Sequence, residues 1–224
     1  MPPILYEDNH LIALLKPHGM PAQPDLTNDP SIVDFTSQYI QHQRQLSSKP
    51  YLALLHRLDR PTAGIILLAK NSKSAARLTE QFKNHTIKKI YLAVTQNIPN
   101  PSQQILSHFL KKNPNKNIVK AYKKPAPNAQ IATLSYKTIQ TNKNLALLEI
   151  KPETGRQHQI RVQLSQIQCP ILGDIKYSQC APLPNRCIAL LAYQLEFQHP
   201  TTQKTITLTA TIPNEYPWNL FTII

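Results

Sequence analysis

The chain contains only three cysteines among its 224 residues, and their spacing excludes two common uses of this residue. Cys169, Cys180 and Cys187 are odd in number and form no Cys-x-x-Cys pair, so they indicate neither a disulfide framework nor a zinc site. This use of cysteine fits a reducing compartment. We therefore expect a fold without a bound metal, held together by a hydrophobic core.

Long hydrophobic runs are also missing. The N-terminal segment carries Glu7, Asp8, Asn9 and His10 where a signal peptide needs an unbroken apolar stretch. No later apolar run approaches the length of about 20 residues that crosses a membrane. These absences predict a cytoplasmic protein without a membrane partner.

Acidic residues are scarce relative to basic ones. Aspartate and glutamate number 12 against 25 lysines and arginines, which gives a formal net charge of +13 and a pI near 9.7. Such an excess favours a polyanionic partner, with nucleic acid as the first candidate. A basic protein with no such partner is the alternative, and charge alone does not decide between them.

The densest local charge lies in residues 111–124, which hold Tyr122 and six lysines but no acidic side chain. The lysines are Lys111, Lys112, Lys116, Lys120, Lys123 and Lys124. Ammonium groups in this number are suited to following a phosphate backbone, so the segment is predicted to be an RNA-facing arm. An ordinary solvated loop has the same composition, and it stays an equal alternative unless the charges share a face.

The periodicity of apolar residues predicts an α+β fold with a mixed, mainly antiparallel sheet and flanking helices. The expected strands are residues 4–6, 11–15, 52–55, 64–69, 87–94, 105–110, 131–139, 145–150, 188–197 and 205–211. One helix is expected to start at Asp29 and Pro30, a second to be capped by Asn71, and a third to cover residues 157–167. No repeat or linker is evident, so we predict one domain over residues 1–224, and nothing demands more than a monomer.

Chemistry-bearing side chains gather first in HRLDRPTAGIILLAK, residues 56–70. Here Asp59 lies between Arg57 and Arg60 on a loop that runs into an apolar strand. Fixed positive charge keeps a neighbouring carboxylate ionised at neutral pH, as a carboxylate must be to attack carbon. Asp59 is therefore a candidate nucleophile. The alternative is an Asx-type turn ahead of Pro61, which is the commoner use of an aspartate in a loop.

A second segment rich in polar groups spans residues 151–174. If a helix begins near Arg156, His158 and Arg161 are three residues apart and project to the same side. An apolar stripe that includes Ile160 would anchor this helix. Spacing alone favours a basic helix with a core histidine, and it gives no distance between Asp59 and Arg161.

Together these segments resemble the RluA-type pseudouridine synthases. HRLDRPTAGIILLAK is followed by KKIYLAV (residues 88–94), then by TGRQHQIRVQL and PILGDIKY, in the family's order. The segment ILYEDNHLIALLKPHGMPAQP, residues 4–24, resembles the family's opening strand pair and Lys-Pro-x-Gly loop. The likeness runs from about residue 4 to residue 210. It implies the pseudouridine synthase fold and a cofactor-free isomerase that converts a uridine within RNA to pseudouridine.

The resemblance also implies roles for single residues. The family's catalytic aspartate falls on Asp59, its base-stacking tyrosine on Tyr91, and the basic residue paired with the aspartate on Arg161. Arg57 matches a position used in RNA contact, and Ile160 matches an apolar residue that lines the uracil pocket. Further substrate contacts are expected from His56, Arg60, Arg156, His158, Lys120 and Lys123.

The chemistry that the resemblance implies begins with extrusion of the uridine from its stack. Stacking of the base on Tyr91 would return about 1–3 kcal/mol, although without the motif Tyr91 would pass for an ordinary strand aromatic. Asp59 would then attack the anomeric carbon, attack the base, or remove a sugar proton. The likeness leaves these routes open.

Three positions depart from the common family pattern: Ala63, Gln157 and Gln163 stand where serine, threonine or serine, and histidine are frequent. They leave the finer substrate preference open. We expect no separate N-terminal RNA-binding module, and hence a short stem-loop of ribosomal or transfer RNA as the substrate. A non-catalytic RNA-binding protein and a base-releasing glycosidase are the competing functions.

Overall fold

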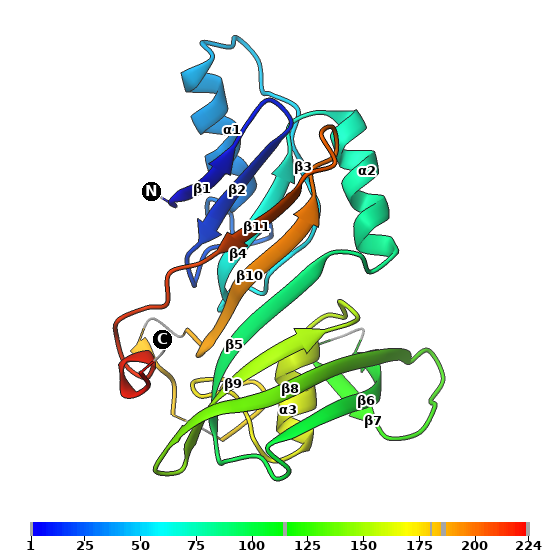
Figure 1. Cartoon of the computed structure of the whole chain (residues 1–224), viewed down its shortest axis with the longest axis vertical. Coiled ribbons are helices and arrows are strands. Elements are labelled where there is room, and N and C mark those ends of the chain that lie inside the picture. The colour runs from blue at the N-terminus through cyan, green and yellow to red at the C-terminus, as the bar shows by residue number, and fades with distance from the viewer. Residues whose placement is uncertain (1, 114–115, 180, 185–186, 223–224) are drawn as a thin grey trace. The chain divides into compact units, whose positions relative to one another are not determined.

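The computed structural model describes residues 2–113, 116–179, 181–184 and 187–222, and its elements are labelled in Figure 1. The chain divides into two compact units. Unit 1 comprises Met1–Lys89 and Ala192–Ala210, and unit 2 comprises Ile90–Leu191 and Thr211–Ile224. The prediction of one domain over the whole chain stays a prediction.

The sheet of unit 1 is built on two apolar runs that are buried along almost their whole length. Its strands are β1 (Ile4–Glu7), β2 (Leu11–Lys16), β3 (Ala53–Leu54), β4 (Ala63–Ala69), β10 (Leu190–Gln198) and β11 (Thr205–Thr209). The order is β1-β2-β4-β10, with β3 paired to β4 and β11 paired to β10. Leu14 of β2 lies opposite Ile66 of β4 in an antiparallel register. Continuous apolar runs are typical of strands that are covered on both faces, and this explains the burial of β2 and β4.

Two helices belong to unit 1, α1 (Ile32–Gln43) and α2 (Ser72–Lys83). The prediction that α1 starts at Asp29 and Pro30 is wrong, because Ser31 is its N-cap. The Ser31 hydroxyl accepts a hydrogen bond from the Asp34 backbone, and the Asp34 carboxylate accepts one from the Ser31 backbone. The predicted cap of α2 is confirmed, since the Asn71 side chain accepts a hydrogen bond from the Ser74 backbone at 2.9 Å.

The core of unit 1 forms where α1 packs against the apolar strands. Its fully or nearly fully buried members are Ile12, Leu14, Ala22, Ile32, Ile66 and Leu68. Gly64 has a close-packing role beside this core: its φ is +128°, and a Cβ added there would lie 2.4 Å from the carbonyl oxygen of Ala192. Only glycine therefore lets β4 pass β10 at this distance.

The strands of unit 2 pair in an antiparallel manner in the order β5-β9-β8-β6-β7. The strands are β5 (Lys88–Gln96), β6 (Gln103–Lys112), β7 (Val119–Tyr122), β8 (Gln130–Asn142) and β9 (Leu145–Pro152). The apolar pattern of the sequence did not predict β7, in which Val119 is buried and Lys120 is exposed. A short 3-10 helix, Trp218–Leu220, lies near the C-terminus.

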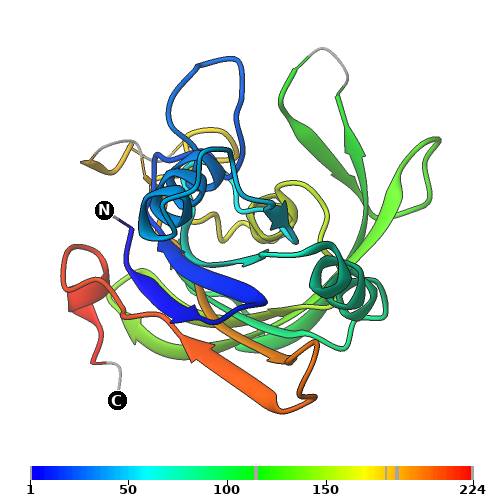
Figure 2. The same cartoon turned by 90° about the horizontal axis from the view of Figure 1, so that it is seen from above.

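One helix, α3 (Gln159–Gln166), packs on one side of this sheet, as Figure 2 shows. Val162 of α3 forms a buried cluster with Leu110, Val119 and Ala132 of three strands. The α+β fold class with a mostly antiparallel sheet is confirmed. None of the helices in the described part of the chain is long and apolar enough to cross a membrane.

Candidate active site

In unit 1, Asp59 lies half-buried on the loop between β3 and β4. The residues before it alternate in exposure: Leu58 is buried, whereas Arg57 is exposed. The backbone of Thr62 donates a hydrogen bond to the Asp59 carbonyl at 2.9 Å, which closes a tight turn. This is a backbone turn, and the Asx-type turn, which would use the Asp59 carboxylate as acceptor, stays a prediction. Asp59 is neither sealed in the core nor fully solvated.

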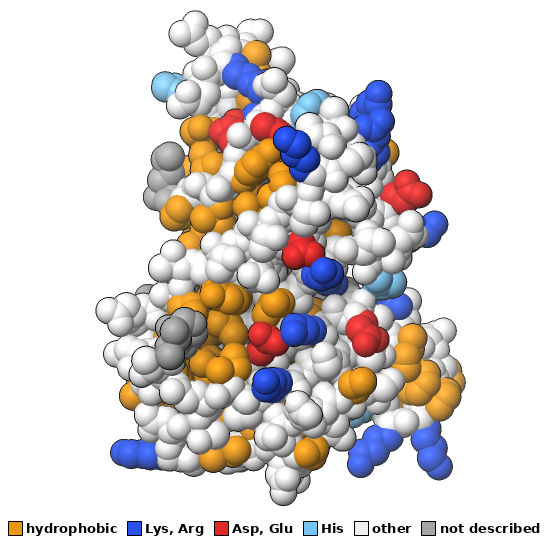
Figure 3. Space-filling model, in the orientation of Figure 1, with side chains coloured by type: hydrophobic (Ala, Val, Ile, Leu, Met, Phe, Trp, Pro, Cys, Tyr) orange, Lys and Arg blue, Asp and Glu red, His pale blue; other side chains and the backbone are white. Residues whose placement is uncertain are grey.

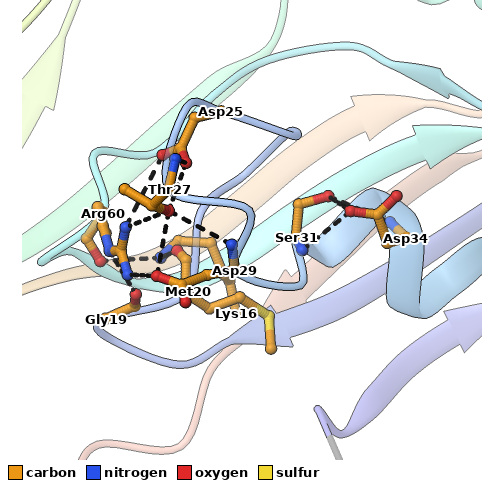
Figure 4. A network of polar contacts seen from close by, with 9 residues as sticks. All are labelled: Lys16, Gly19, Met20, Asp25, Thr27, Asp29, Ser31, Asp34 and Arg60. Atoms are coloured by element: carbon orange, nitrogen blue, oxygen red, sulfur yellow. Dashed lines mark hydrogen bonds and ion pairs between the residues drawn. The ribbon is translucent and has the colours of Figure 1, made fainter.

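Lys16 is a residue of this region to which sequence reasoning assigned no role. It ends β2 with no exposed surface, and its ammonium donates to the carbonyl oxygens of Met20 and Arg60 at 2.8 and 3.3 Å (Figure 4). It also donates to the Pro17 carbonyl at 2.9 Å. The group thereby uses all three of its hydrogens. It ties the segment after β2 to the Asp59 loop. The signal in the sequence was a lysine that closes an otherwise apolar strand.

The charge of Lys16 is coupled to that of Asp59. Burial lowers the pKa of Lys16 to about 7, the charge of Asp59 raises it, and the charge of Arg60 lowers it further. This mutual influence makes Lys16 a buried electrostatic neighbour of the Asp59 carboxylate.

The Arg60 guanidinium is engaged by the loop that precedes α1 (Figure 4). It donates from Nε to the Gly19 carbonyl at 2.8 Å and from Nη1 to the Thr27 hydroxyl at 3.0 Å. Nη2 pairs with the Asp29 carboxylate, and the Asp25 carboxylate lies 3.8 Å from Nη1. The hydrogen bond from Arg60 lowers the pKa of Asp29. Arg60 thus joins two loops, and its predicted contact with RNA stays a prediction.

His56 also has a partner inside unit 1. Its Nε2 accepts a hydrogen bond from the Leu67 backbone at 3.1 Å, and its ring stacks on Phe82 with the ring centres 5.2 Å apart. Burial, assisted by the nearby charge of Lys89, lowers the pKa of His56 to about 4. The imidazole is consequently neutral at pH 7 and connects the start of the Asp59 loop to β4.

In unit 2, Arg161 is 4% exposed on α3 and forms a two-pronged ion pair with Asp174. Nε and Nη2 lie 2.7 and 2.8 Å from the two carboxylate oxygens. The guanidinium carbon also lies 5.2 Å from the centre of the Tyr177 ring. Such geometry holds the planar cation in one orientation. Asp174 belongs to the motif PILGDIKY, but no role was predicted for it. The sequence indicated it only as a single acidic residue after an apolar stretch.

The start of α3 differs from the prediction. The helix begins at Gln159 rather than near Arg156, and His158 at its N-cap has a φ of 53°. The His158 Nδ1 lies 2.5 Å from the Tyr177 hydroxyl, so His158 and Arg161 both contact Tyr177. Gly173, with a φ of +83°, forms the tight turn that precedes Asp174.

The remaining predicted residues of unit 2 differ in exposure. Tyr91 is half-buried on β5 opposite Ile150, and Ile160 is buried on α3. Arg156 is exposed, and its Nε donates to a backbone carbonyl at 3.2 Å. Lys120 and Lys123 are exposed at β7 and just beyond it.

Comparison with known proteins decides the family. A family model described as RNA pseudouridylate synthase matches residues 10–166. The chain belongs to this family. The resemblance to the RluA-type enzymes is confirmed, and the protein is an RNA pseudouridine synthase, an isomerase.

Relatives of this synthase cover most of its length. The ribosomal large subunit pseudouridine synthase C of Rickettsia typhi is 33% identical over 94% of this chain and 68% of its own. The ribosomal large subunit pseudouridine synthase D of Borreliella burgdorferi is 29% identical over 86% of this chain and 60% of its own. The solved structure of human RNA pseudouridylate synthase domain containing 4 aligns with a TM-score of 0.77 and 28% identity, over 94% of this chain and 88% of that one.

A pseudouridine synthase must detach uracil from ribose at nitrogen and rejoin it at carbon. Unit 1 of this synthase offers a carboxylate on a loop that is held at several points. Unit 2 offers a buried guanidinium held by a carboxylate and a ring. Within the described ranges, no group of three or more His, Cys, Asp and Glu side chains is placed to hold a metal ion.

Proposed function

We propose that this synthase converts a uridine of ribosomal RNA to pseudouridine, with Asp59 as the reacting carboxylate and no cofactor. The names of its relatives support the ribosomal substrate. The net charge of +13 suits binding to RNA, and ribosomal RNA would place the reaction in the cytoplasm. We expect the protein to act as a monomer.

The observation that carries the role of Asp59 is its position. The side chain is partly exposed on a loop whose Arg60 carbonyl is held by Lys16, and a turn closes directly after it. A rigid loop reduces the entropy lost when the reacting atoms are aligned. The charge of Asp59 also raises the pKa of the buried Lys16, so the two charges attract. Both features suit a group that has to attack carbon.

Access to the glycosidic bond requires that the target uridine leave its stack. Tyr91 is proposed to stack against the extruded base, which would return about 1–3 kcal/mol of the energy lost on unstacking. The exposed guanidinium of Arg57 is proposed to contact RNA where the nucleotide has left. Ile160 is proposed to line the uracil pocket.

Arg161 is proposed to serve the reaction as a cation of fixed orientation. Its ion pair with Asp174 keeps the guanidinium planar to the carboxylate and unable to swing away. A preorganised charge needs no rearrangement while charge develops in the transition state. Exclusion of water is equally necessary, because water would divert an activated sugar to free uracil and an abasic site.

The other predicted contacts divide by exposure. Arg156, Lys120 and Lys123 are exposed, and we expect them to contact the RNA backbone. His56, Arg60 and His158 already hold backbone or side-chain partners within their units. We expect these three residues to stabilise the segments 56–70 and 151–174 and, in addition, to contact the substrate.

The test is the Asp59→Asn variant, which keeps the shape of the side chain and removes its charge. It should form no pseudouridine on ribosomal RNA from cells that lack the protein, while RNA binding changes less than about threefold. Glu80→Gln removes an acid from the exposed side of α2 and is the matched control, with turnover retained. The measurement looks for a uridine isomer of unchanged mass that is retained in the RNA chain. It is made on ribosomal RNA and also on transfer RNA, the second candidate substrate.

Pseudouridine formed at the normal rate by Asp59→Asn would end the assignment of Asp59. Free uracil as the product would support the glycosidase instead. Turnover confined to transfer RNA would keep the chemistry and overturn the ribosomal substrate.

A further inference from the structure

One face of the sheet in unit 2 is open. Side chains of a strand alternate between its two faces, and α3 covers the face that carries Leu110, Val119 and Ala132. The intervening residues of β6, β7 and β8 point to the other face, and cross-strand pairing arranges them in rows. In the space-filling view, lysines and hydrophobic side chains are exposed together over this half of the chain (Figure 3).

The first feature of the open face is a row of apolar and aromatic side chains. Phe109 on β6 lies directly opposite Tyr122 on β7 and Ile131 on β8. Tyr122 is 38% exposed and Ile131 is 43% exposed, while Phe109 between them is half-buried. A solvent-facing row across three strands is a platform on which planar groups can stack.

The second feature is an excess of positive charge. Lys111 on β6 lies directly opposite Lys120 on β7, one row beyond the aromatic row, and Lys137 lies on the same face of β8. Like charges in direct opposition destabilise a sheet. Glu149 on β9 lies opposite Lys137, whereas no carboxylate of the described residues forms an ion pair with Lys111 or Lys120. Lysine on an edge strand such as β7 discourages aggregation, but Lys111 and Lys137 lie on inner strands, where that reason does not apply.

The third feature is a hollow of about 370 Å³ at the other end of the same face, between β6, β8 and β9. Its polar lining consists of Gln103, Gln104, Ser135, Tyr136, Lys137, Glu149 and Lys151. Glu149 is the acid among them, and it is paired with Lys151 at 2.8 Å. The hollow is large enough for a small ligand, and its amides can both donate to and accept from the edge of a base.

We propose that the open face, defined by Gln103, Phe109, Lys111, Lys120, Tyr122, Ile131 and Lys137, binds a single-stranded segment of the RNA substrate. Phosphates lie on the lysines, bases stack on the aromatic row, and one base enters the hollow. The site is distinct from the residues proposed for catalysis on α3. It deepens the proposed function, because it rests on RNA being the substrate and adds where the flanking strand is held.

The dimensions agree with this occupant. From Gln103 to Lys111 the face extends about 27 Å along β6, at about 3.4 Å per residue. Single-strand binding folds hold about 4 nucleotides or more in one site. Duplex RNA fits less well, because its bases are stacked on one another and cannot reach the aromatic row. An acidic protein segment could neutralise the lysines, but its carboxylates offer no planar base to the aromatic row.

The test compares Lys111→Gln/Lys120→Gln with Lys73→Gln/Lys83→Gln, which removes the same charge from the exposed side of α2. The probe is a fluorescein-labelled oligouridine of about eight nucleotides. The first variant should bind at least about tenfold more weakly, and the slope of log K against log salt should fall by about 1.4, as expected for two lost phosphate contacts. The α2 variant should bind like the unaltered protein.

Tyr122→Ala tests the stacking row separately and should weaken oligouridine binding about fivefold or more without a change in salt slope. Lys111→Arg/Lys120→Arg keeps the charge and should restore binding, which separates loss of contact from loss of fold. With the RNA substrate, the glutamine variant should raise KM and leave kcat unchanged.

Unchanged oligouridine binding by the glutamine variant would overturn the proposal. Equal competition by duplex RNA or by polyglutamate would also overturn it, since the face would then be a general surface for duplexes or acidic proteins. Failure of this proposal is distinguishable from failure of the catalytic one. Asp59→Asn should bind oligouridine normally. Turnover by Asp59→Asn would contradict the catalytic role of Asp59 and would not affect the binding result.

Discussion

Two buried cations, Arg161 in unit 2 and Lys16 in unit 1, lie beside the two motif segments and are held in different ways. Arg161 has a charged partner, because Asp174 accepts two hydrogen bonds from its guanidinium. Lys16 is surrounded by backbone carbonyls at 2.8 to 3.3 Å. One cation is therefore neutralised where it lies, and the other is stabilised only by dipoles and by the charge of Asp59.

The difference has a chemical consequence. An arginine keeps its proton at every relevant pH, so Arg161 provides a charge of constant size and direction. Burial lowers the pKa of Lys16 to about 7, so its charge varies near neutral pH. We infer that unit 2 supplies a permanent cation, whereas unit 1 carries a cation that responds to its surroundings.

The largest effect is expected from removing the partner of the permanent cation. Asp174→Ala leaves the Arg161 guanidinium buried without its carboxylate, and the free energy of unfolding should fall by about 3–5 kcal/mol. Urea denaturation measures this loss. The double variant Asp174→Ala/Arg161→Met should recover a large part of it, because no buried charge is then left behind. A loss below about 1 kcal/mol in the single variant would show that the pair is not what holds Arg161.

An intermediate effect is expected from the pH dependence of Lys16. Between pH 7 and about 10 the unfolded chain retains the proton on this lysine while the folded protein releases it. The unfolded state then binds more protons, so the free energy of unfolding should rise with pH by at most about 1.4 kcal/mol per unit. Below pH 7 both states are protonated and this slope should vanish.

Lys16→Met provides the control for that measurement. It should lack the slope between pH 7 and 10, and it should be less stable by about 1–3 kcal/mol because three buried carbonyls lose their donor. Denaturation curves collected at several pH values separate the two effects. An identical slope in both proteins would place the titration on another group.

The smallest effect is expected at Arg60, whose guanidinium is 40% exposed. Arg60→Gln breaks its ion pair with Asp29, and exposed pairs contribute only about 0–1 kcal/mol. Stability should therefore change little, in contrast to Asp174→Ala. Turnover should nevertheless fall clearly, because the loop that precedes α1 is no longer tied to the Asp59 loop. A loss of stability as large as that of Asp174→Ala would remove the distinction between exposed and buried arginines.

Local patterns in the sequence were sufficient for most of the fold. The apolar runs of β2 and β4 and the cap at Asn71 were predicted because burial and capping depend on residues only a few positions apart. The start of α1 was wrong because two consecutive segments could each cap a helix, and the capping box of Ser31 and Asp34 prevailed over Asp29 and Pro30. β7 was missed because it has only four residues, one of them a lysine, and lies within the lysine-rich segment 111–124.

The sequence by itself determined which family the chain resembles and to which residues that family's chemistry is assigned, since the motif segments are contiguous and their order is visible. Tertiary structure alone decided the partners of the charges. Lys16 meets the Arg60 carbonyl 44 residues away, and Lys111 meets Lys120 only because β6 and β7 pair in one register. Such contacts depend on chain crossing and strand register, which no local pattern encodes, so the role of Lys16, the anchor at Asp174 and the open face emerge only once the chain is folded.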